Sequence, residues 1–549
     1  MGIKSLPKYT ALAMAFGLAL SVQGQQNGLP AIAPNAVHTI NGLDAEQMYA
    51  EDNSRKKPYH PENVGRLLVV NLTPYNSGEW ITTDKGSVWR LKVKLDGAKA
   101  VTLLGKMENM PNGASLIVYG NNTPAVKNTY KTADFSTQNI ISTTPVAGQE
   151  AVIEYFVPNG TSNTAHLTIE RLCYIYRYTD PNETQTDGFG DASSCNVNVN
   201  CSEGDNWRNQ RNSVVRILSY TDFNTQWCTG TMVNNTSQKI KPYLLTAMHC
   251  GLGFNDSLSN DTMFKYWLFT FNYQAPSCAN PMSEGNLADN KITGSKVLAH
   301  TEDKGGELGS DFLLLEITQP IPPSYGVYYS GWSLDTTEDY TDSAVCIHHP
   351  KYDIKKISTS TWPLKKGAPY PTSPDNTHWE VLWSATANGH GVTEPGSSGS
   401  ALFNKKGYLI GTLTGGSASC NKLNGTDFYG RLDWHWDKNG STPRSRLKDW
   451  LDSTNTGVTS VSGAYLYPES VGETVEKDKL TLYPNPANNW LRISGSEFDN
   501  ATITTVLGQQ LQTIALQNGW LHIETLPAGV YIVSVNNGNT TYTGRFIKQ

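Results

Sequence analysis

The sequence of 549 residues has little that would indicate a nucleic-acid, membrane or metal-binding protein. Only 17% of its residues are charged and the formal net charge is −6, which gives no case for binding nucleic acid or a membrane surface. The eight cysteines form no CxxC pair, and no HExxH motif occurs. The sequence therefore predicts no metal site.

Long hydrophobic runs are also missing after the N-terminus. The apolar run from Ala11 to Val22 follows Lys4 and Lys8 and is too short to span a bilayer. Small and polar residues come next, so we expect residues 1–24 to be a secretory signal peptide. The mature protein is then expected to be exported and to have no transmembrane segment.

Export makes the cysteines informative, because most of the eight should pair in an oxidising compartment. The 48 glycines and the hydrophobic content of 38% are typical of folded β domains with many loops. The length predicts three or four domains. Alternating apolar and polar residues in 88–95 and 151–157 predict strands with one solvated face.

The most informative stretch is 393–402, Thr-Glu-Pro-Gly-Ser-Ser-Gly-Ser-Ala-Leu. It has the Gly-x-Ser-Gly form found around the nucleophile of serine peptidases with a chymotrypsin-like barrel. Glycine on both sides allows a tight loop whose N–H groups face a substrate carbonyl. Ser398 is the predicted nucleophile, and the N–H groups of Gly396 and Ser398 are the predicted oxyanion hole. An ordinary surface turn is the alternative for this stretch alone.

Two further segments favour catalysis over a turn. An apolar run ends in Thr-Ala-Met-His249-Cys250, as if a strand delivers His249 to a cleft. Asp311 stands before the apolar run Phe-Leu-Leu-Leu, where its carboxylate can orient an imidazole. The chain order His249, Asp311, Ser398 is that of chymotrypsin-like enzymes. The sequence thus predicts a catalytic triad.

Residues 195–452 resemble the bacterial lysyl endopeptidases, a secreted branch of the chymotrypsin-like serine peptidases. The resemblance follows the whole segment in order. The matching stretches are Ser-Cys195-Asn-Val-Asn-Val-Asn-Cys201, Cys228-Thr-Gly-Thr-Met-Val, Leu-Thr-Ala-Met-His249-Cys250, Ser310-Asp311-Phe-Leu-Leu-Leu-Glu, Ile347-His-His-Pro350, Glu-Pro-Gly-Ser-Ser398-Gly-Ser and Asp427-Phe-Tyr-Gly-Arg431. The resemblance implies a double β-barrel, cleavage after lysine in protein or peptide substrates, and no metal or organic cofactor.

The resemblance also implies the disulfides and the pocket that selects lysine. The implied pairs are Cys195–Cys420, Cys201–Cys278 and Cys228–Cys250. Cys173 and Cys346 are left over, either as buried thiols or as a bridge between the first region and the barrel. Asp427 matches the family's anion at the base of the S1 pocket, which binds the residue before the cleaved bond.

The surroundings of the triad depart from the family pattern. Where the family has a tryptophan and a histidine near the catalytic imidazole, this chain has Tyr370 and Thr414, and Gly415 follows. We expect these three residues to line the substrate site with Asp427. An aromatic ring at Tyr370 can still stack near His249, and the change can alter rate or pH range without altering the reaction.

The final region resembles the C-terminal sorting domain of the type IX secretion system. Its signals are Leu482-Tyr-Pro-Asn-Pro-Ala and Ala528-Gly-Val-Tyr-Ile-Val-Ser-Val, and short strands between turn dipeptides predict a compact β-sandwich. The resemblance implies export through the periplasm and outer membrane by the type IX machinery, then removal of the domain and release or attachment to surface lipopolysaccharide.

These observations predict a mainly β protein that acts as a monomeric, secreted or surface-attached serine endopeptidase. Two alternatives stay open: selectivity for arginine or for both basic residues, and a non-catalytic adhesin on a peptidase scaffold. The predicted parts are a signal peptide (1–24), a β-rich pro-region (25–188), a peptidase domain (189–455), a linker (456–476) and a sorting domain (477–549). Residues Thr179 to Ser194, rich in Gly, Asp and Thr, are predicted to be a linker between the pro-region and the barrels. No lysine lies between Lys131 and Lys239, so a lysine-specific enzyme cannot release its own pro-region at this first linker. Either another peptidase cuts there, for instance at Arg177, or the region stays attached.

Overall fold

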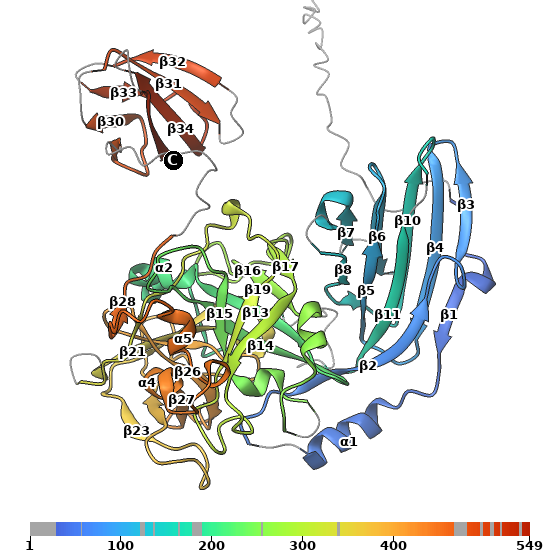
Figure 1. Cartoon of the computed structure of the whole chain (residues 1–549), viewed down its shortest axis with the longest axis horizontal. Helices are drawn as coiled ribbons and strands as arrows, with labels where there is room; N and C mark the ends of the chain where they lie inside the picture. Colours follow the sequence, from blue (N-terminus) through green and yellow to red (C-terminus); the bar gives the residue numbers. More distant parts are fainter. Residues whose placement is uncertain are drawn as a thin grey trace, which may run out of the picture. The chain divides into compact units, whose positions relative to one another are not determined.

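The structure is a computed structural model, and it divides into two compact units, Met1–Tyr467 and Pro468–Gln549 (Figure 1). The predicted signal peptide and much of both predicted linkers lie outside the described residues. The structure describes residues 29–549 except for 56–57, 121–126, 136–137, 163–164, 178–188, 254–255, 338–340, 466–479, 495–497, 506–509, 517–518 and 537–540.

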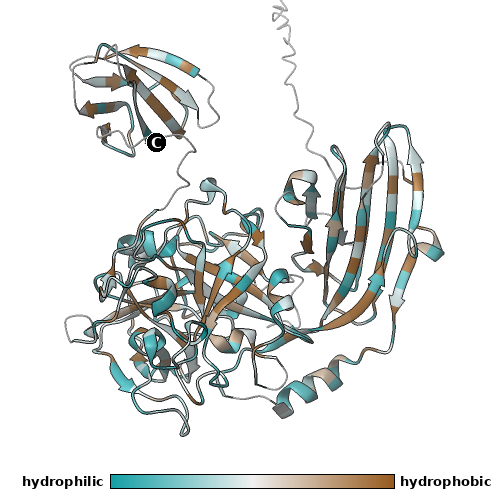
Figure 2. Ribbon diagram, in the orientation of Figure 1, coloured by the Kyte–Doolittle hydropathy of each residue, from teal (hydrophilic) through white to brown (hydrophobic). Residues whose placement is uncertain are grey.

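The N-terminal region packs two β-sheets face to face. The strands predicted over 88–95 and 151–157 are present as β4 and β10, which pair antiparallel with Ala151 opposite Val93. Apolar and polar bands alternate along both strands, and the apolar faces form a core with the second sheet (Figure 2). The elements are β1 (Val37–Ile40), α1 (Ala45–Arg55), β2 (Asn63–Leu72), β3 (Glu79–Thr83), β4 (Gly86–Leu95), β5 (Ala100–Glu108), β6 (Ser115–Gly120), β7 (Lys127–Lys131), β8 (Ile140–Ser142), β9 (Val146–Ala147), β10 (Glu150–Pro158) and β11 (His166–Ile175), with short 3-10 turns at Pro34–Ala36 and Thr132–Phe135.

Strand β2 joins this region to the next. One edge of β2 pairs with β11, and its first residues pair with β14 of the following domain, with Gly65 opposite Thr225. The second sheet of the N-terminal region therefore continues into the first barrel (Figure 1).

The first barrel of the next domain is a closed antiparallel sheet with strand order β17-β16-β13-β14-β15-β19-β18. The outer strands β17 and β18 are separated only by Gly294, whose N–H donates to Trp267 and whose carbonyl accepts from Thr318, so the sheet closes on itself. Its strands are β13 (Val214–Tyr220), β14 (Asn224–Met232), β15 (Tyr243–Thr246), β16 (Leu268–Phe271), β17 (Lys291–Thr293), β18 (Ser295–His300) and β19 (Leu313–Ile317).

The second barrel has the order β22-β21-β25-β26-β27-β24-β23, and the Ser384 N–H after β24 closes it by donating to Thr359 of β22. Apolar residues of both barrels, among them Leu245 and Ile347, share one core, which holds the barrels together. The elements are β12 (Val197–Asn198), α2 (Arg208–Arg211), β20 (Trp332–Ser333), β21 (Ala344–His348), β22 (Lys356–Ser360), β23 (Lys365–Gly367), β24 (His378–Leu382), β25 (Ala401–Asn404), β26 (Leu409–Gly416), β27 (Thr426–Arg431), α4 (Leu432–Asp437), α5 (Lys448–Leu451) and β28 (Ser460–Val461). The short 3-10 turns of the two-barrel domain are Ser202–Trp207, Met248–Gly251, Asp261–Tyr266, Pro323–Tyr325, Pro350–Tyr352 and Pro443–Ser445.

The C-terminal unit is a small sandwich, as the sequence predicts. Leu491 and Ile493 of one sheet pack with Ile503 and Val533 of the other. Its strands are β29 (Thr481–Tyr483), β30 (Trp490–Ser494) and β33 (Trp520–His522) in one sheet, and β31 (Asn500–Thr505), β32 (Gln510–Ala515), β34 (Gly529–Asn536) and β35 (Thr541–Lys548) in the other. The prediction of a mainly β protein is confirmed. Among the described residues, no helix has the length and apolar character that crossing a membrane requires.

Candidate active site

His249 and Asp311 lie together at the ends of two paired strands of the first barrel. His249 follows β15 in the 3-10 turn Met248–Gly251, and Asp311 precedes β19, the partner of β15. Both side chains are fully buried, and His249 Nδ1 lies 2.6 Å from Asp311 Oδ2. The backbone N–H of His249 also donates to Asp311 Oδ1 at 2.9 Å. One carboxylate therefore holds the imidazole and its backbone together.

Asp311 is stabilised as an anion. Burial alone opposes its charge, but the neighbouring His249 and hydrogen bonds from His249 and Thr414 outweigh burial and lower the pKa of Asp311. Its backbone φ of +61° lies in the left-handed region, which a non-glycine residue seldom adopts. This conformation needs support from the surrounding structure.

That support comes from Asp303, which the sequence motifs do not single out. Its Oδ2 accepts the Asp311 backbone N–H at 2.7 Å, and its Oδ1 accepts the N–H groups of Gly305 and Gly306, each at 3.1 Å. Burial and the charge of Asp311 raise the pKa of Asp303 to about 6. The only signal in the sequence is an aspartate followed by Lys-Gly-Gly, a turn that an aspartate closes onto its own backbone.

Ser398 lies in the loop between β24 and β25, against the segment that carries His249. Its carbonyl accepts the Thr229 backbone N–H at 2.8 Å. Gly399 has φ +79°, and a Cβ there would lie 2.7 Å from the backbone nitrogen of Ala247. Only glycine permits this approach, which brings the serine loop against the segment that carries His249. Among the described residues, His249 Nε2 is buried and has no hydrogen-bond partner.

The two predicted oxyanion donors flank Ser397 in this loop. Gly396 has φ +95°, and its carbonyl accepts the Thr229 hydroxyl at 2.8 Å. Ser397 is fully buried, whereas 8% of the Ser398 surface is exposed. The loop thus leaves Ser398 slightly exposed, while its neighbour Ser397 is wholly buried.

Asp427 on β27 is buried and linked to the same loop. Its Oδ2 accepts Trp383 Nε1 at 2.6 Å and the Thr393 hydroxyl at 2.7 Å, and its Oδ1 accepts the Ala418 N–H at 3.3 Å. Burial raises the pKa of Asp427, although these hydrogen bonds oppose the shift. The carboxylate therefore gains from a cation that reaches it.

Thr414 lies beneath the pair of His249 and Asp311 rather than at the surface. It is fully buried, hydrogen-bonds to Asp311, and its hydroxyl lies 3.0 Å from His378 Nε2. Burial lowers the pKa of His378 to about 3, so this ring is neutral.

Residues 58–62 of the N-terminal region lie over the site. Tyr370 donates its hydroxyl to the carbonyl of Pro58 at 2.5 Å and packs edge-on against the ring of Tyr59, with ring centroids 5.3 Å apart. Tyr59 also presses on Gly415, where a Cβ would lie 2.6 Å from the Tyr59 Cβ. The predicted substrate residues Tyr370 and Gly415 therefore contact the chain's own N-terminal region.

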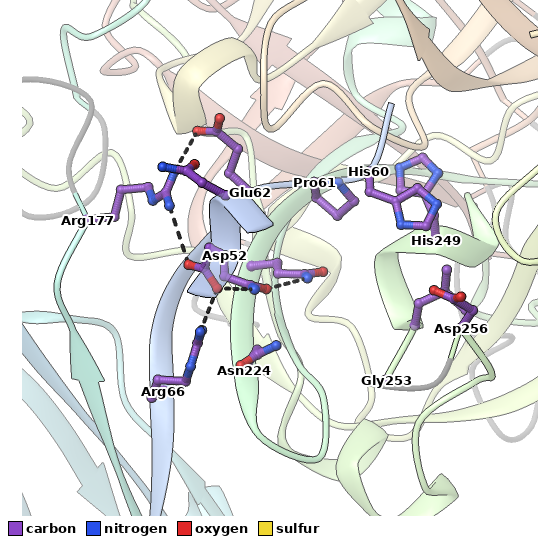
Figure 3. Close-up of a pocket in the computed structure, with 14 residues that line it drawn as sticks. Asp52, His60, Pro61, Glu62, Arg66, Arg177, Asn224, His249, Gly253 and Asp256 are labelled. Carbon is purple, nitrogen blue, oxygen red and sulfur yellow. Dashed lines mark hydrogen bonds and ion pairs between the residues drawn. The ribbon is translucent and has the colours of Figure 1, made fainter. Parts of the chain in front are cut away.

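The ring stacked beside His249 is His60, not Tyr370. The two imidazoles are nearly parallel, with centroids 6.0 Å apart and an interplanar angle of 12° (Figure 3). They border a pocket of about 130 Å³ between the two regions. On its far side Asp52 of α1 pairs with Arg66 at 2.5 Å and with Arg177 at 3.3 Å, which ties α1 to the N-terminal sheet.

The structure contains the three disulfides that the resemblance implied. Cys228–Cys250 joins β14 to the residue after His249. Cys173 and Cys346 are separate buried thiols, so the alternative of a bridge between them is wrong. The other two disulfides are Cys195–Cys420 and Cys201–Cys278.

Comparison with known proteins agrees with this architecture. Residues 189–430 match the family described as lysyl endopeptidase, C-terminal domain. A lysyl endopeptidase of Pseudomonas aeruginosa is 26% identical over 413 residues, which cover 70% of this chain and 83% of that protein. The peptidase domain belongs to the lysyl endopeptidase family. The chain is accordingly a serine endopeptidase.

The C-terminal unit of this lysyl endopeptidase-family protein has its own match. Residues 481–549 match the secretion system C-terminal sorting domain. The protein is therefore secreted or held at the cell surface through the type IX secretion system.

Solved structures with some likeness to the chain are also proteases. Protease Anisep from Arthrobacter nicotinovorans has 16% identity and a TM-score of 0.29, over 44% of this chain and 97% of that one. A protease of M. tuberculosis in its active form has 13% identity and a TM-score of 0.27, over 46% and 89%. At these scores the likeness adds nothing to the family assignment.

Proposed function

We propose that this serine endopeptidase cleaves peptide bonds on the carboxyl side of lysine through an acyl-enzyme. The observation that carries the proposal is the buried His249–Asp311 pair, 2.6 Å apart, beside the tight loop of Ser398. A second observation supports the choice of substrate, because the buried anion Asp427 is bonded to the same loop through Thr393.

In the proposed mechanism, His249 removes the proton from the Ser398 hydroxyl as it attacks the substrate carbonyl. Asp311 keeps the Nδ1 hydrogen in place and stabilises the imidazolium that forms. The N–H groups of Gly396 and Ser398 donate to the oxyanion, each worth about 3–4 kcal/mol in the transition state. Water then attacks the acyl-enzyme, with His249 as the base once more.

Selectivity for lysine is proposed from the charge of Asp427. Its carboxylate is buried and already accepts three hydrogen bonds. The ammonium group of a substrate lysine would add the positive charge that stabilises a buried carboxylate. A substrate with a neutral side chain leaves this anion unpaired.

The N-terminal region is proposed to be a pro-region that keeps the enzyme latent. Tyr59 and His60 lie against Gly415 and His249, where a bound peptide would have to pass. Because no lysine lies between Lys131 and Lys239, release by cleavage in the predicted linker requires another peptidase. N-terminal sequencing of the secreted enzyme tests this idea, and a new terminus directly after Lys131 would contradict it.

The main test is a digest of a protein mixture by the processed enzyme, with new C-termini read by mass spectrometry. Termini almost all at lysine are expected, and Asp427→Asn should lower kcat/KM for a lysine substrate by roughly 10²–10³-fold, as for loss of one partner of a buried charge pair. Asp433→Asn, which removes a carboxylate bonded to Arg431 and Lys438, is the matched control and should keep the selectivity. Cuts shared equally with arginine would reject the lysine pocket but not the triad.

A further inference from the structure

Behind the serine loop lies a buried histidine that the proposed mechanism does not use. His348 ends β21 and is fully buried. Its Nδ1 lies 2.7 Å from the hydroxyl of Ser397, and its Nε2 lies 3.1 Å from the hydroxyl of Ser358 on β22. One imidazole therefore connects the residue before Ser398 to a strand of the second barrel.

The other partners of the two hydroxyls fix the direction of these hydrogen bonds. Ser397 Oγ accepts the Glu394 N–H at 3.1 Å, so its own hydrogen is available for His348 Nδ1. Ser358 donates to the Val392 carbonyl at 3.0 Å, so it accepts from His348 Nε2. The histidine is thus neutral with its hydrogen on Nε2. Burial, with the nearby charge of Lys356, lowers the pKa of His348 to about 3, so this arrangement persists at neutral pH.

Ser397 makes backbone hydrogen bonds to both sides of the loop. Its N–H donates to the Glu394 carbonyl at 2.9 Å, and its carbonyl accepts the Ser400 N–H at 3.0 Å. The proposed oxyanion donors, the N–H groups of Gly396 and Ser398, stand on either side of it. A rotation of the Ser397 backbone would therefore turn one or both donors away from the substrate oxygen.

We propose that His348 is a positioning residue that acts through Ser397 to hold the Gly396 and Ser398 N–H groups towards the oxyanion. The inference rests on the function proposed above. The contacts that carry it run from His348 to Ser400 within the second barrel, and none of them involves the N-terminal region. The loop should accordingly have the same shape before and after the N-terminal region is removed.

The test uses two amides that reproduce different halves of the imidazole. The side-chain oxygen of asparagine stands about where Nδ1 stands and can accept from Ser397, whereas glutamine reaches the position of Nε2. We expect His348→Gln and Ser397→Ala to lower kcat on a lysine p-nitroanilide by roughly 10–100-fold, a fraction of the loss of a whole oxyanion donor. KM should change less than about threefold, and His348→Asn should stay within about threefold of the wild-type kcat.

Ser360→Ala is the matched control, because Ser360 is a buried serine on the same strand as Ser358 but bonds to Trp362 instead. It should behave like wild type. Equal kcat for His348→Gln and wild type overturns the proposal. So does an equal loss in the asparagine and glutamine variants with fewer sites titrated by a lysyl phosphonate, since that marks general unfolding.

A second readout does not need activity. In a Ser398→Ala background, hydrogen exchange of the 394–400 peptide should speed up with His348→Gln and not with His348→Asn. Unchanged exchange in both rejects the positioning role. If wild type neither hydrolyses the substrate nor takes up the phosphonate, the proposed function fails, and the exchange result still decides the role of His348 in the loop.

Discussion

Two histidine rings meet at the candidate site, and the regions that supply them are held in different ways. His249 is fixed inside the barrel domain by two hydrogen bonds to Asp311 and by the adjacent Cys228–Cys250 disulfide. His60 belongs to a segment of the N-terminal region that is fastened at its ends, by the Tyr370 hydroxyl on Pro58 and by a 2.8 Å hydrogen bond from Gln226 to Asn63.

This difference separates the groups around His249 from the segment that covers them. The bonds that shape the His249 site are buried and internal to the peptidase domain, so they do not depend on His60. The covering segment relies on side-chain contacts and on the short pairing of β2 with β14. If the N-terminal region is the proposed pro-region, the bonds around His249 need no change when the covering segment leaves. The rest of that region shares an apolar core with the first barrel, in which Leu67 and Leu104 lie with Ile217 and Trp267.

The sharpest test exchanges each histidine for alanine in the intact chain, and kcat is compared before and after the N-terminal region is removed. His249→Ala should lower kcat by about 10⁴–10⁶-fold because it removes the base. His60→Ala should leave kcat unchanged, because its ring is not part of the chemistry. Hydrolysis of a lysine p-nitroanilide measures both, and near-ultraviolet circular dichroism checks that the folds match. A large loss in His60→Ala would show that the N-terminal region contributes to catalysis.

A second test measures how the stability that Asp303 contributes to the peptidase side depends on pH. The pKa of Asp303 is raised to about 6, against about 3.8 for an unfolded aspartate. A raised carboxyl pKa means that the folded protein holds the proton more tightly. The stability that this group contributes is therefore fully present below about pH 4 and lost as pH rises through about 6, a change of up to about 3 kcal/mol.

The measurement is the free energy of unfolding by urea at several pH values, in a Ser398→Ala background that prevents self-digestion. The Asp303→Asn variant should have a lower free energy of unfolding than its parent at every pH. Between pH 4 and 6.5 that free energy should fall less than in the parent, because the variant has no carboxyl group to lose the proton. Asp52→Asn removes a carboxylate from the covering side and is the comparison variant. Parallel pH curves for Asp303→Asn and its parent would contradict the raised pKa.

Sequence reasoning succeeds where the structure depends on a local pattern. Ser398 stands out because a tight loop needs Gly396 and Gly399, and His249 because an apolar strand leads to it. The close approach of Gly399 to Ala247 gives the physical reason for that pattern. The sandwich of the C-terminal unit follows likewise from short alternating strands.

It fails where distant segments meet. His60 sits in a polar stretch without a motif, and only the fold stacks it on His249. Tyr370 invites the expectation of an aromatic ring near the imidazole, but Tyr59 is its partner. His348 lies in a stretch that matches the family, yet its role depends on Ser358 and Ser397 across two strands. Such contacts leave no periodic signal in one sequence.

The weakest effect should come from the cover itself, tested in the intact, unprocessed chain. Tyr59 contacts Tyr370 and Gly415, so Tyr59→Ala removes much of the packing that holds the segment down. A loss of about 2 kcal/mol, typical of a buried aromatic anchor, shifts the balance between covered and open forms by roughly thirtyfold. Activity of the intact chain on a lysine p-nitroanilide should rise accordingly.

Tyr75→Ala, at a tyrosine of the same region that is 81% exposed, should change nothing. After processing, the Tyr59→Ala enzyme and wild type should be equal, because the covering segment is then gone. Equal activity of the intact Tyr59→Ala and wild-type chains would mean that this ring does not close the site.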